Sequence, residues 1–131
     1  MNINSFGMTP KYLVMIEQAL VANSVKLLAS KVQGKSLKDC LEWHPKERNR
    51  IHLVNKDGGR VIKTAYLTDR PFFFLNHVNA FEDGAGNVVV DVVGYDSPDV
   101  VDCTTVEKLR NGGFKPKVNG LVLCFKSMGS V

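Results

Sequence analysis

The sequence has few cysteines, no long apolar run and no signal-like start. Its three cysteines, Cys40, Cys103 and Cys124, are widely spaced, and no pair has the short separation of a zinc or redox motif. We expect them to be buried or free thiols in a reducing compartment. No apolar run approaches the roughly 20 residues that span a bilayer, and the first residues lack a basic region followed by an apolar one. These absences predict a soluble, cytoplasmic protein and leave contact with a membrane surface open.

The charge pattern also lacks a concentrated patch of one sign. Lysine and arginine number 17 against 13 acidic residues, giving a formal net charge of +4. The basic residues are scattered from Lys11 to Lys126, whereas a nucleic-acid-binding face needs a dense basic footprint, so we expect no nucleic acid partner. No glycine-rich loop precedes a helix, which argues against nucleotide binding. No serine lies in a recognisable nucleophile turn.

Short strand-like runs separated by turns make up most of the chain. The 131 residues are 44% hydrophobic, which is enough to fill one core. Residues 12–16 predict a buried strand, and four later runs form two pairs, each joined by a glycine-containing turn typical of a β-hairpin. The pairs are 50–55 with 60–67 and 72–81 with 88–95. This pattern predicts a mainly β fold, an antiparallel meander.

One short helix is expected at residues 23–32. Asn23 or Ser24 is available as its N-cap, and Gly34 as its stop. Its apolar positions at helical spacing are Val25, Leu28 and Val32. We expect these side chains to pack against the rest of the domain. Residues 104–110 fit either the end of a strand or the start of a helix.

A histidine in the run 72–81 raises the functional question. Strict alternation along a strand places His77 with Phe73, Leu75, Asn79 and Phe81 on one face, and Phe72, Phe74, Asn76, Val78 and Ala80 on the other. A lone histidine there is either a core residue bonded to a neighbour or a metal ligand. Spacing does not decide, because the histidines form no HxxxH pattern. Of the others, we expect His52 to be structural or on the surface.

Several stretches resemble one family, the animal carotenoid cleavage oxygenases, which include the β-carotene oxygenases and the retinoid isomerase of the retinal pigment epithelium. The stretch "FFFLNHVNAFEDGAGNVVVDVVGYD" is similar to the family's Phe-x-His-x-Asn-Ala-Phe/Tyr-Glu-Asp signature and the Val-Asp strand after it. Three further stretches resemble family segments in the same order: "NSFGMTPKYLVMIEQAL", "WHPKERNRIHLVNKDGGR" and "VEKLRNG". Residues 113–131 form a divergent tail that matches no family segment. Glu82 and Asp83 of the signature open a turn, where we expect solvated carboxylates.

The resemblance implies a seven-bladed β-propeller that carries one non-haem iron(II) on its axis. Residues 1–131 would then be a single partial segment of about two blades with one short helix. The family's iron is held by four histidines and is used with O2 to cleave or isomerise carotenoids or retinoids. His77 falls on one of these four iron ligands, and neutral imidazoles suit iron(II). Asn4 stands where the family has another, and an asparagine offers only a weak carbonyl oxygen.

The resemblance therefore implies an incomplete iron site, because the chain lacks the regions that carry the other two histidines. It assigns no catalytic or substrate-binding residue here. It also matches residues 23–32 to a partly apolar segment near the substrate entrance that contacts membranes, which would make peripheral membrane contact a role of this helix.

Three hypotheses follow from the sequence. The first is a fragment of a carotenoid-cleaving iron(II) dioxygenase, inactive alone. The second is a non-catalytic truncated relative that binds an apolar ligand or a protein partner, with self-association through exposed sheet edges. The third is an unrelated small β-domain in which His77 is structural.

Overall fold

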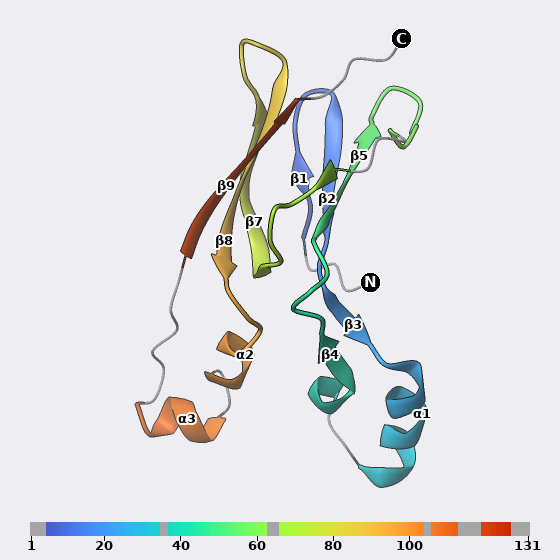
Figure 1. Ribbon diagram of the computed structural model, residues 1–131, viewed down its shortest axis with the longest axis vertical. Coiled ribbons are helices and arrows are strands. Elements are labelled where there is room, and N and C mark those ends of the chain that lie inside the picture. Colours follow the sequence, from blue (N-terminus) through green and yellow to red (C-terminus); the bar gives the residue numbers. More distant parts are fainter. Residues whose placement is uncertain (1–4, 35–36, 63–65, 104–105, 113–118, 127–131) are drawn as a thin grey trace.

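The computed structural model describes residues 5–34, 37–62, 66–103, 106–112 and 119–126. Within these ranges the chain is mainly β, and every strand pair is antiparallel (Figure 1). The strands form three sheets, with the orders β1-β2-β5-β6, β3-β4 and β7-β8-β9. The predicted fold class, antiparallel β with a short helix, is confirmed.

The first sheet is built around the predicted strand at 12–16. Its strands are β1 (Gly7–Met8), β2 (Tyr12–Glu17), β5 (Arg50–Asn55) and β6 (Tyr66–Leu67). Alternate β2 side chains, from Tyr12 to Ile16, are buried, as a strand with one core face requires. The turn after β5 contains Gly58 and Gly59 with φ of 102° and 66°, which confirms the predicted glycine turn. The returning strand is shorter than predicted, since only Tyr66–Leu67 and an isolated bridge at Val61 pair with β5 among the described residues.

The third sheet contains the predicted second hairpin and one further strand. Its members are β7 (Phe73–Glu82), β8 (Asn87–Tyr95) and β9 (Asn119–Lys126). β9 comes from the divergent tail and pairs with β8 from Asn119 to Lys126. The central strand β8 carries a run of valines, and Val88, Val90 and Val92 are buried. Such β-branched residues are typical of a strand that pairs with a neighbour on each side and has one face in the core.

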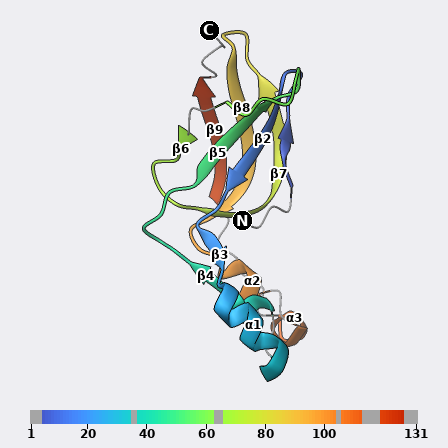
Figure 2. The same ribbon diagram turned by 90° about the vertical axis from the view of Figure 1, so that its right-hand side faces the viewer.

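The core lies between these two sheets, which face each other in both views (Figures 1 and 2). Its buried members are Tyr12, Val14, Ile16, Ile51, Leu53, Phe72, Phe74, Val88, Val90 and Val92. A second, smaller cluster forms around Leu20, Phe73 and Val100. The three consecutive phenylalanines are therefore divided between the clusters: Phe72 and Phe74 pack in the first, and Phe73 packs in the second.

The remaining elements are short and lie at the lower end of Figure 1. They are β3 (Leu20–Ala22), α1 (Ser24–Gln33), the 3-10 turn η1 (Leu37–Cys40), β4 (Leu41–Trp43), α2 (Val100–Cys103) and α3 (Val106–Arg110). Residues 106–110, left open between strand and helix, are thus helical. Cys40 is a buried thiol. No helix within the described ranges is long and apolar enough to cross a membrane.

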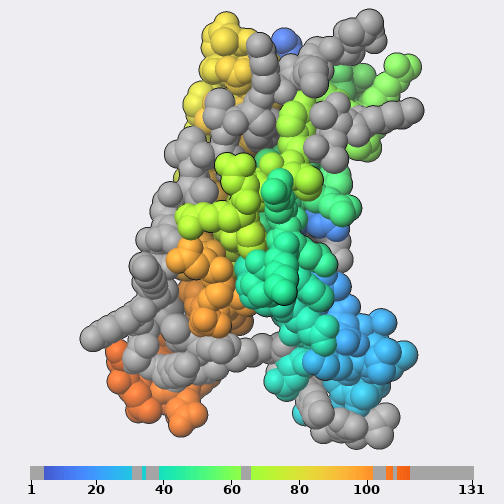
Figure 3. All heavy atoms as spheres, viewed as in Figure 1, coloured from blue at the N-terminus to red at the C-terminus, as the bar shows by residue number. Residues whose placement is uncertain are grey.

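Helix α1 confirms the predicted boundaries but not the predicted packing. Asn23 caps it by accepting the backbone N–H groups of the first turn, and Gly34 ends it with φ of 63°. Val25 and Leu28 are 73% and 71% exposed, so the expectation that they pack against the domain is wrong; the side chain of Val32 lies outside the described residues. The reason is that α1 projects beside η1 at the edge of the molecule (Figure 3), and among its described side chains, those of residues 24–30, Ser30 is the buried one.

Candidate functional site

Two β-bulges in β7 place His77 on the side of the main core. Phe74 pairs with Gly94 and His77 with Val92, so three steps along β7 match two along β8. A second shift lies between His77 and Asn79. Each bulge adds one residue and reverses the face on which the next side chain lies, and bulges re-aim side chains next to functional sites.

Strict alternation was predicted along the whole strand. This prediction is wrong between Phe74 and Asn79, where the bulges lie, and it holds on either side of them. Phe74 and Ala80 share one side of the strand, as the alternation predicts, and this is the core side. His77 lies on the same side, since its ring meets Phe74 edge-on with centroids 5.0 Å apart and an interplanar angle of 84°. Val78, which the alternation places with Phe74 and Ala80, is 65% exposed.

The imidazole of His77 is held on one nitrogen and unpartnered on the other. Ser5 Oγ lies 2.9 Å from Nδ1 and also accepts the backbone N–H of His77 at 2.8 Å. The other ring nitrogen, Nε2, is buried and has no hydrogen-bond partner within the described ranges. Burial lowers the pKa of His77, which favours the neutral ring. A buried polar atom without a partner costs free energy, so its presence points to a ligand from outside the described residues.

Strand β1 covers the ring at very short range. A Cβ built on Gly7 would lie 2.9 Å from Cβ of Ala80 and 3.5 Å from Cδ2 of His77. Only a residue without a side chain allows β1 to lie this close to β7. Beside this contact runs a groove of about 220 Å³, lined by Phe6, Gly7, Met8, His77, Val78, Asn79 and Ala80. Phe6 and Met8, which line the groove, are more than half exposed, whereas the surface of the groove itself is mainly polar.

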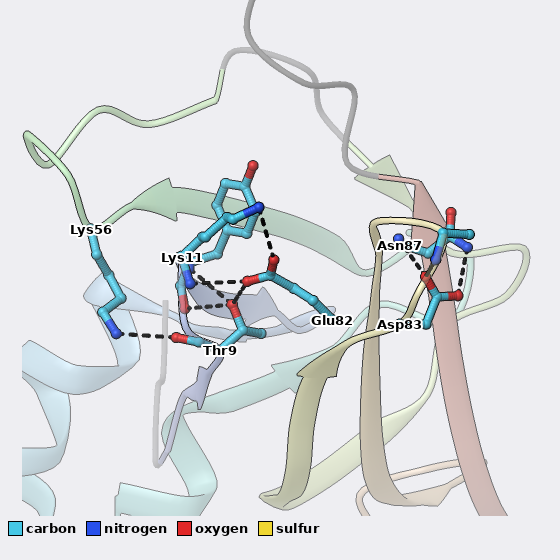
Figure 4. Close-up of polar contacts among 8 residues, drawn as sticks. Thr9, Lys11, Lys56, Glu82, Asp83 and Asn87 are labelled. Carbon is cyan, nitrogen blue, oxygen red and sulfur yellow. Dashed lines mark hydrogen bonds and ion pairs between the residues drawn. The ribbon is translucent and has the colours of Figure 1, made fainter.

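Glu82, at the end of β7, contacts the turn between β1 and β2 (Figure 4). Its Oε1 accepts the hydroxyl of buried Thr9 at 2.7 Å and the backbone N–H of Lys11 at 2.9 Å. Lys11 Nζ lies 3.7 Å from the other oxygen. The hydrogen bond from Thr9, followed by that from Lys11, holds the pKa of the Glu82 carboxyl below its ordinary value. The expectation of a solvated Glu82 is wrong, because its side chain is only 14% exposed and it joins the β1–β2 turn to β7.

Asp83, the second carboxylate of the signature, organises the hairpin turn. Its oxygens accept the backbone N–H groups of Ala85 and Asn87 and the side-chain amide of Asn87, at 2.7 to 2.9 Å (Figure 4). These bonds lower the pKa of Asp83. An acceptor satisfied by its own turn is a structural residue.

The described residues contain no complete set of metal ligands. No group of three or more His, Cys, Asp or Glu side chains converges within them. His52 Nε2 lies 3.1 Å from a Glu17 oxygen across the β2–β5 pair, which confirms its structural role, and His44 lies near Glu47. His77 fits a metal through its buried, neutral Nε2, as one ligand among others supplied elsewhere. Asn4, the second position implied by the resemblance, lies outside the described residues.

Sequence reasoning missed the residues that hold His77. Ser5 and Gly7 are about seventy residues away along the chain, and nothing in the local pattern connects them to the strand. The only signal was their place in "SFG", which resembles the family segment. Glu82 was noticed in the signature but interpreted as a solvated turn residue.

Comparisons with known proteins place the chain in a family. Residues 1–122 match the family model described as retinal pigment epithelial membrane protein. Carotenoid-cleaving dioxygenase, mitochondrial, of Homo sapiens is 36% identical over 84% of the chain, and β,β-carotene 15,15'-dioxygenase of Gallus gallus is 32% identical over 81%. The chain spans 19% and 20% of the length of these two relatives.

Solved structures give the same result. Cobalt-substituted ACO of Synechocystis, an apocarotenoid oxygenase, superposes with a TM-score of 0.61 at 26% identity and covers 73% of the chain, which spans 19% of that protein. An ACO/RPE65 chimera superposes with a TM-score of 0.65 over 92% of the chain, which spans 23% of it; at 24% identity this match shows the fold alone. The matched sequence and the shared fold together show that the chain belongs to the carotenoid oxygenase family that includes retinal pigment epithelial membrane protein.

Proposed function

We propose that the chain is a segment of a non-haem iron(II) dioxygenase that cleaves carotenoids or apocarotenoids with O2, and that His77 is one of its iron ligands. In this proposal residues 1–131 form one partial propeller segment, with the two large sheets as neighbouring blades and 113–131 as a divergent tail. The names of its relatives, which are carotenoid dioxygenases, support the reaction and the substrate class.

One observation carries the proposal: among the described residues, Nε2 of His77 is buried and has no hydrogen-bond partner, while Ser5 holds Nδ1 and burial lowers the pKa of the ring, which favours its neutral form. Iron(II) binds neutral imidazole well, and when bound it supplies the activation of dioxygen. His77 would hold the metal through Nε2. The other ligands would come from outside the described residues, so we expect the 131 residues to be inactive alone.

The test is a chimera in which residues 5–112 replace the matching segment of the Synechocystis apocarotenoid oxygenase. The chimera should cleave an apocarotenoid, the same chimera with His77→Ala should not, and the 131-residue chain alone should not. Cleavage by the His77→Ala chimera would contradict the role of His77. Stoichiometric iron and cleavage in the 131-residue chain would show that its site is complete.

The second candidate is a non-catalytic relative that binds an apolar ligand or a protein partner. Three apolar residues that line the β1–β7 groove favour it, since Phe6, Met8 and Val78 are 57% to 65% exposed. Single exposed apolar residues are ordinary, but a group of them around a groove is typical of a binding surface. Self-association through the sheet edges belongs to this candidate, and a monomer on size-exclusion chromatography would count against it. The third hypothesis, an unrelated β-domain, is wrong because the chain belongs to the family.

Peripheral membrane contact through α1 is part of the first proposal. Val25 and Leu28 are exposed on a helix that also carries Lys26, a combination typical of interfacial helices. Loss of vesicle binding in a Val25→Ser, Leu28→Ser variant would support it, and unchanged binding would contradict it. The cytoplasmic location stays a prediction, since the relative from Homo sapiens is named as mitochondrial.

A further inference from the structure

Ser5 contacts His77 twice with one oxygen atom. Its Oγ is 2.8 Å from the backbone nitrogen and 2.9 Å from Nδ1 of the ring. These residues are 72 positions apart. A single hydroxyl therefore connects the start of β1 to the middle of β7.

The place of β7 at the edge of its sheet explains why both contacts exist. Among the described residues β8 pairs with one side of β7 only, so a backbone N–H of β7 that points away from β8 needs another acceptor. Ser5 Oγ supplies it, because a hydroxyl has two acceptor positions and one donor hydrogen. One acceptor position takes the His77 N–H, which leaves the hydrogen and one lone pair for Nδ1.

We propose that Ser5 is the positioning residue of His77, fixing both the bulged backbone and the ring so that Nε2 keeps one orientation. This inference rests on the proposed function only in treating Nε2 as a metal ligand. A carboxylate at Nδ1 would accept only. A hydroxyl can donate to Nδ1 when the ring proton is on Nε2. It can also accept from Nδ1 when that nitrogen carries the proton, and Nε2 is then free to bind a metal. The same contact therefore holds both neutral forms of the ring.

The test compares Ser5→Val with Ser5→Thr in the full 131-residue chain. Valine and threonine have the same branched shape, and only threonine keeps the hydroxyl. Two quantities are measured by NMR: the exchange rate of the His77 backbone amide with D2O, and the nitrogen-15 shifts of the His77 ring. The matched control is Ser97→Ala, which removes the hydrogen bond between Ser97 and Asp99 in an exposed loop.

In Ser5→Val the His77 amide should exchange about fivefold to tenfold faster, as expected for one lost hydrogen bond. The Nδ1 shift should move to that of an unbonded ring nitrogen. Ser5→Thr and Ser97→Ala should match the unaltered chain in both quantities. Unchanged exchange and unchanged Nδ1 shift in Ser5→Val would overturn the inference.

If Ser5→Val fails to fold, the unaltered chain decides: an Nδ1 shift typical of a hydrogen-bonded nitrogen supports the inference, and an unbonded shift overturns it. Failure of the proposed function is separate. If the NMR results hold but His77→Ala leaves the apocarotenoid-cleaving chimera active, Ser5 positions His77, but His77 is no essential iron ligand.

Discussion

The segment from Ser5 to Lys11 contacts β7 at two places, and the two contacts differ in how well their polar atoms are satisfied. At one place Ser5 holds Nδ1 of His77, while Nε2 is buried and has no hydrogen-bond partner among the described residues. At the other, both oxygens of Glu82 face donors from Thr9 and Lys11. The positions belong to one sequence signature and lie on one strand.

The difference separates a structural residue from a functional candidate by a physical criterion. Both carboxylate oxygens of Glu82 have partners within the described residues, and these contacts connect the β1–β2 turn to β7. They give Glu82 a structural role. The bonds of His77 are incomplete, and proteins tolerate a buried unpartnered atom mainly where function requires it. Substitutions at the two places should therefore have opposite consequences for stability.

The largest effect is expected from Gly7→Ala, which disturbs the strand between both contacts. The added Cβ would lie 2.9 Å from Cβ of Ala80, and overpacking of this kind costs about 2–3 kcal/mol. Urea unfolding measures it. Gly84→Ala is the control, because a Cβ there meets nothing within 4 Å. Equal midpoints for the two variants would show that β1 does not lie this close to β7.

Glu82→Gln should destabilise the chain by about 1–2 kcal/mol, since it weakens the charge-assisted bonds from Thr9 and Lys11. The same urea experiment measures the loss. Glu47→Gln, at an exposed carboxylate 3.9 Å from His44, is the control and should change little. An unchanged urea midpoint in Glu82→Gln would mean that the contact between Glu82 and the β1–β2 turn does not stabilise the fold.

The pH dependence of stability should come partly from Glu82. Its folded pKa lies below the unfolded value because of the Thr9 bond, so its contribution is present above the ordinary glutamate pKa of 4.5 and is lost as pH falls through the folded pKa. Unfolding midpoints measured from pH 7 downward should fall less steeply in Glu82→Gln than in the unaltered chain. Asp83, whose pKa is also lowered, should keep part of the slope in both proteins. Identical slopes would contradict the account.

His77→Leu should leave the free energy of unfolding within about 1 kcal/mol of the unaltered chain, or raise it. The substitution removes a buried nitrogen that lacks a partner and keeps an apolar side chain beside Phe74. Thermal unfolding measures the change. A loss as large as that expected for Gly7→Ala would show that His77 is primarily structural.

The smallest effect is expected from Lys11→Ala. The Lys11 side chain is 69% exposed and 3.7 Å from Glu82, and surface ion pairs of this kind contribute less than about 1 kcal/mol. Thr9→Val, which removes a buried hydroxyl from the same carboxylate, should cost more. The reverse order in urea unfolding would mean that the charge of Lys11, and not the hydroxyl, fastens Glu82.

The sequence predicted the elements whose signals are local. The strand at 12–16 follows from its apolar run of strand-forming residues, the first hairpin from Gly58 and Gly59, and the ends of α1 from Asn23 and Gly34, where the backbone geometry agrees. These features depend on neighbours within a few residues. The resemblance supplied what periodicity did not, namely a reason to interpret His77 as a metal ligand and not as a core residue.

The rest depends on contacts between distant residues. Alternation alone put His77 opposite Phe74, because a bulge is an extra residue that only the pairing with β8 defines. Ser5 could not be connected to His77 from sequence separation. The packing of α1 was predicted from its own periodicity, yet Val25 and Leu28 are exposed because the body of the protein lies against another side of the helix.

The most direct test of the account is the iron content of the chimera that carries residues 5–112 in the Synechocystis apocarotenoid oxygenase. Purified after loading with iron(II), it should hold one iron per molecule. His52→Ala should keep that iron, because His52 is paired with Glu17, whereas His77→Ala should lose most of it. Full iron occupancy in the His77→Ala chimera would contradict the claim that the unpartnered Nε2 of His77 is a metal ligand.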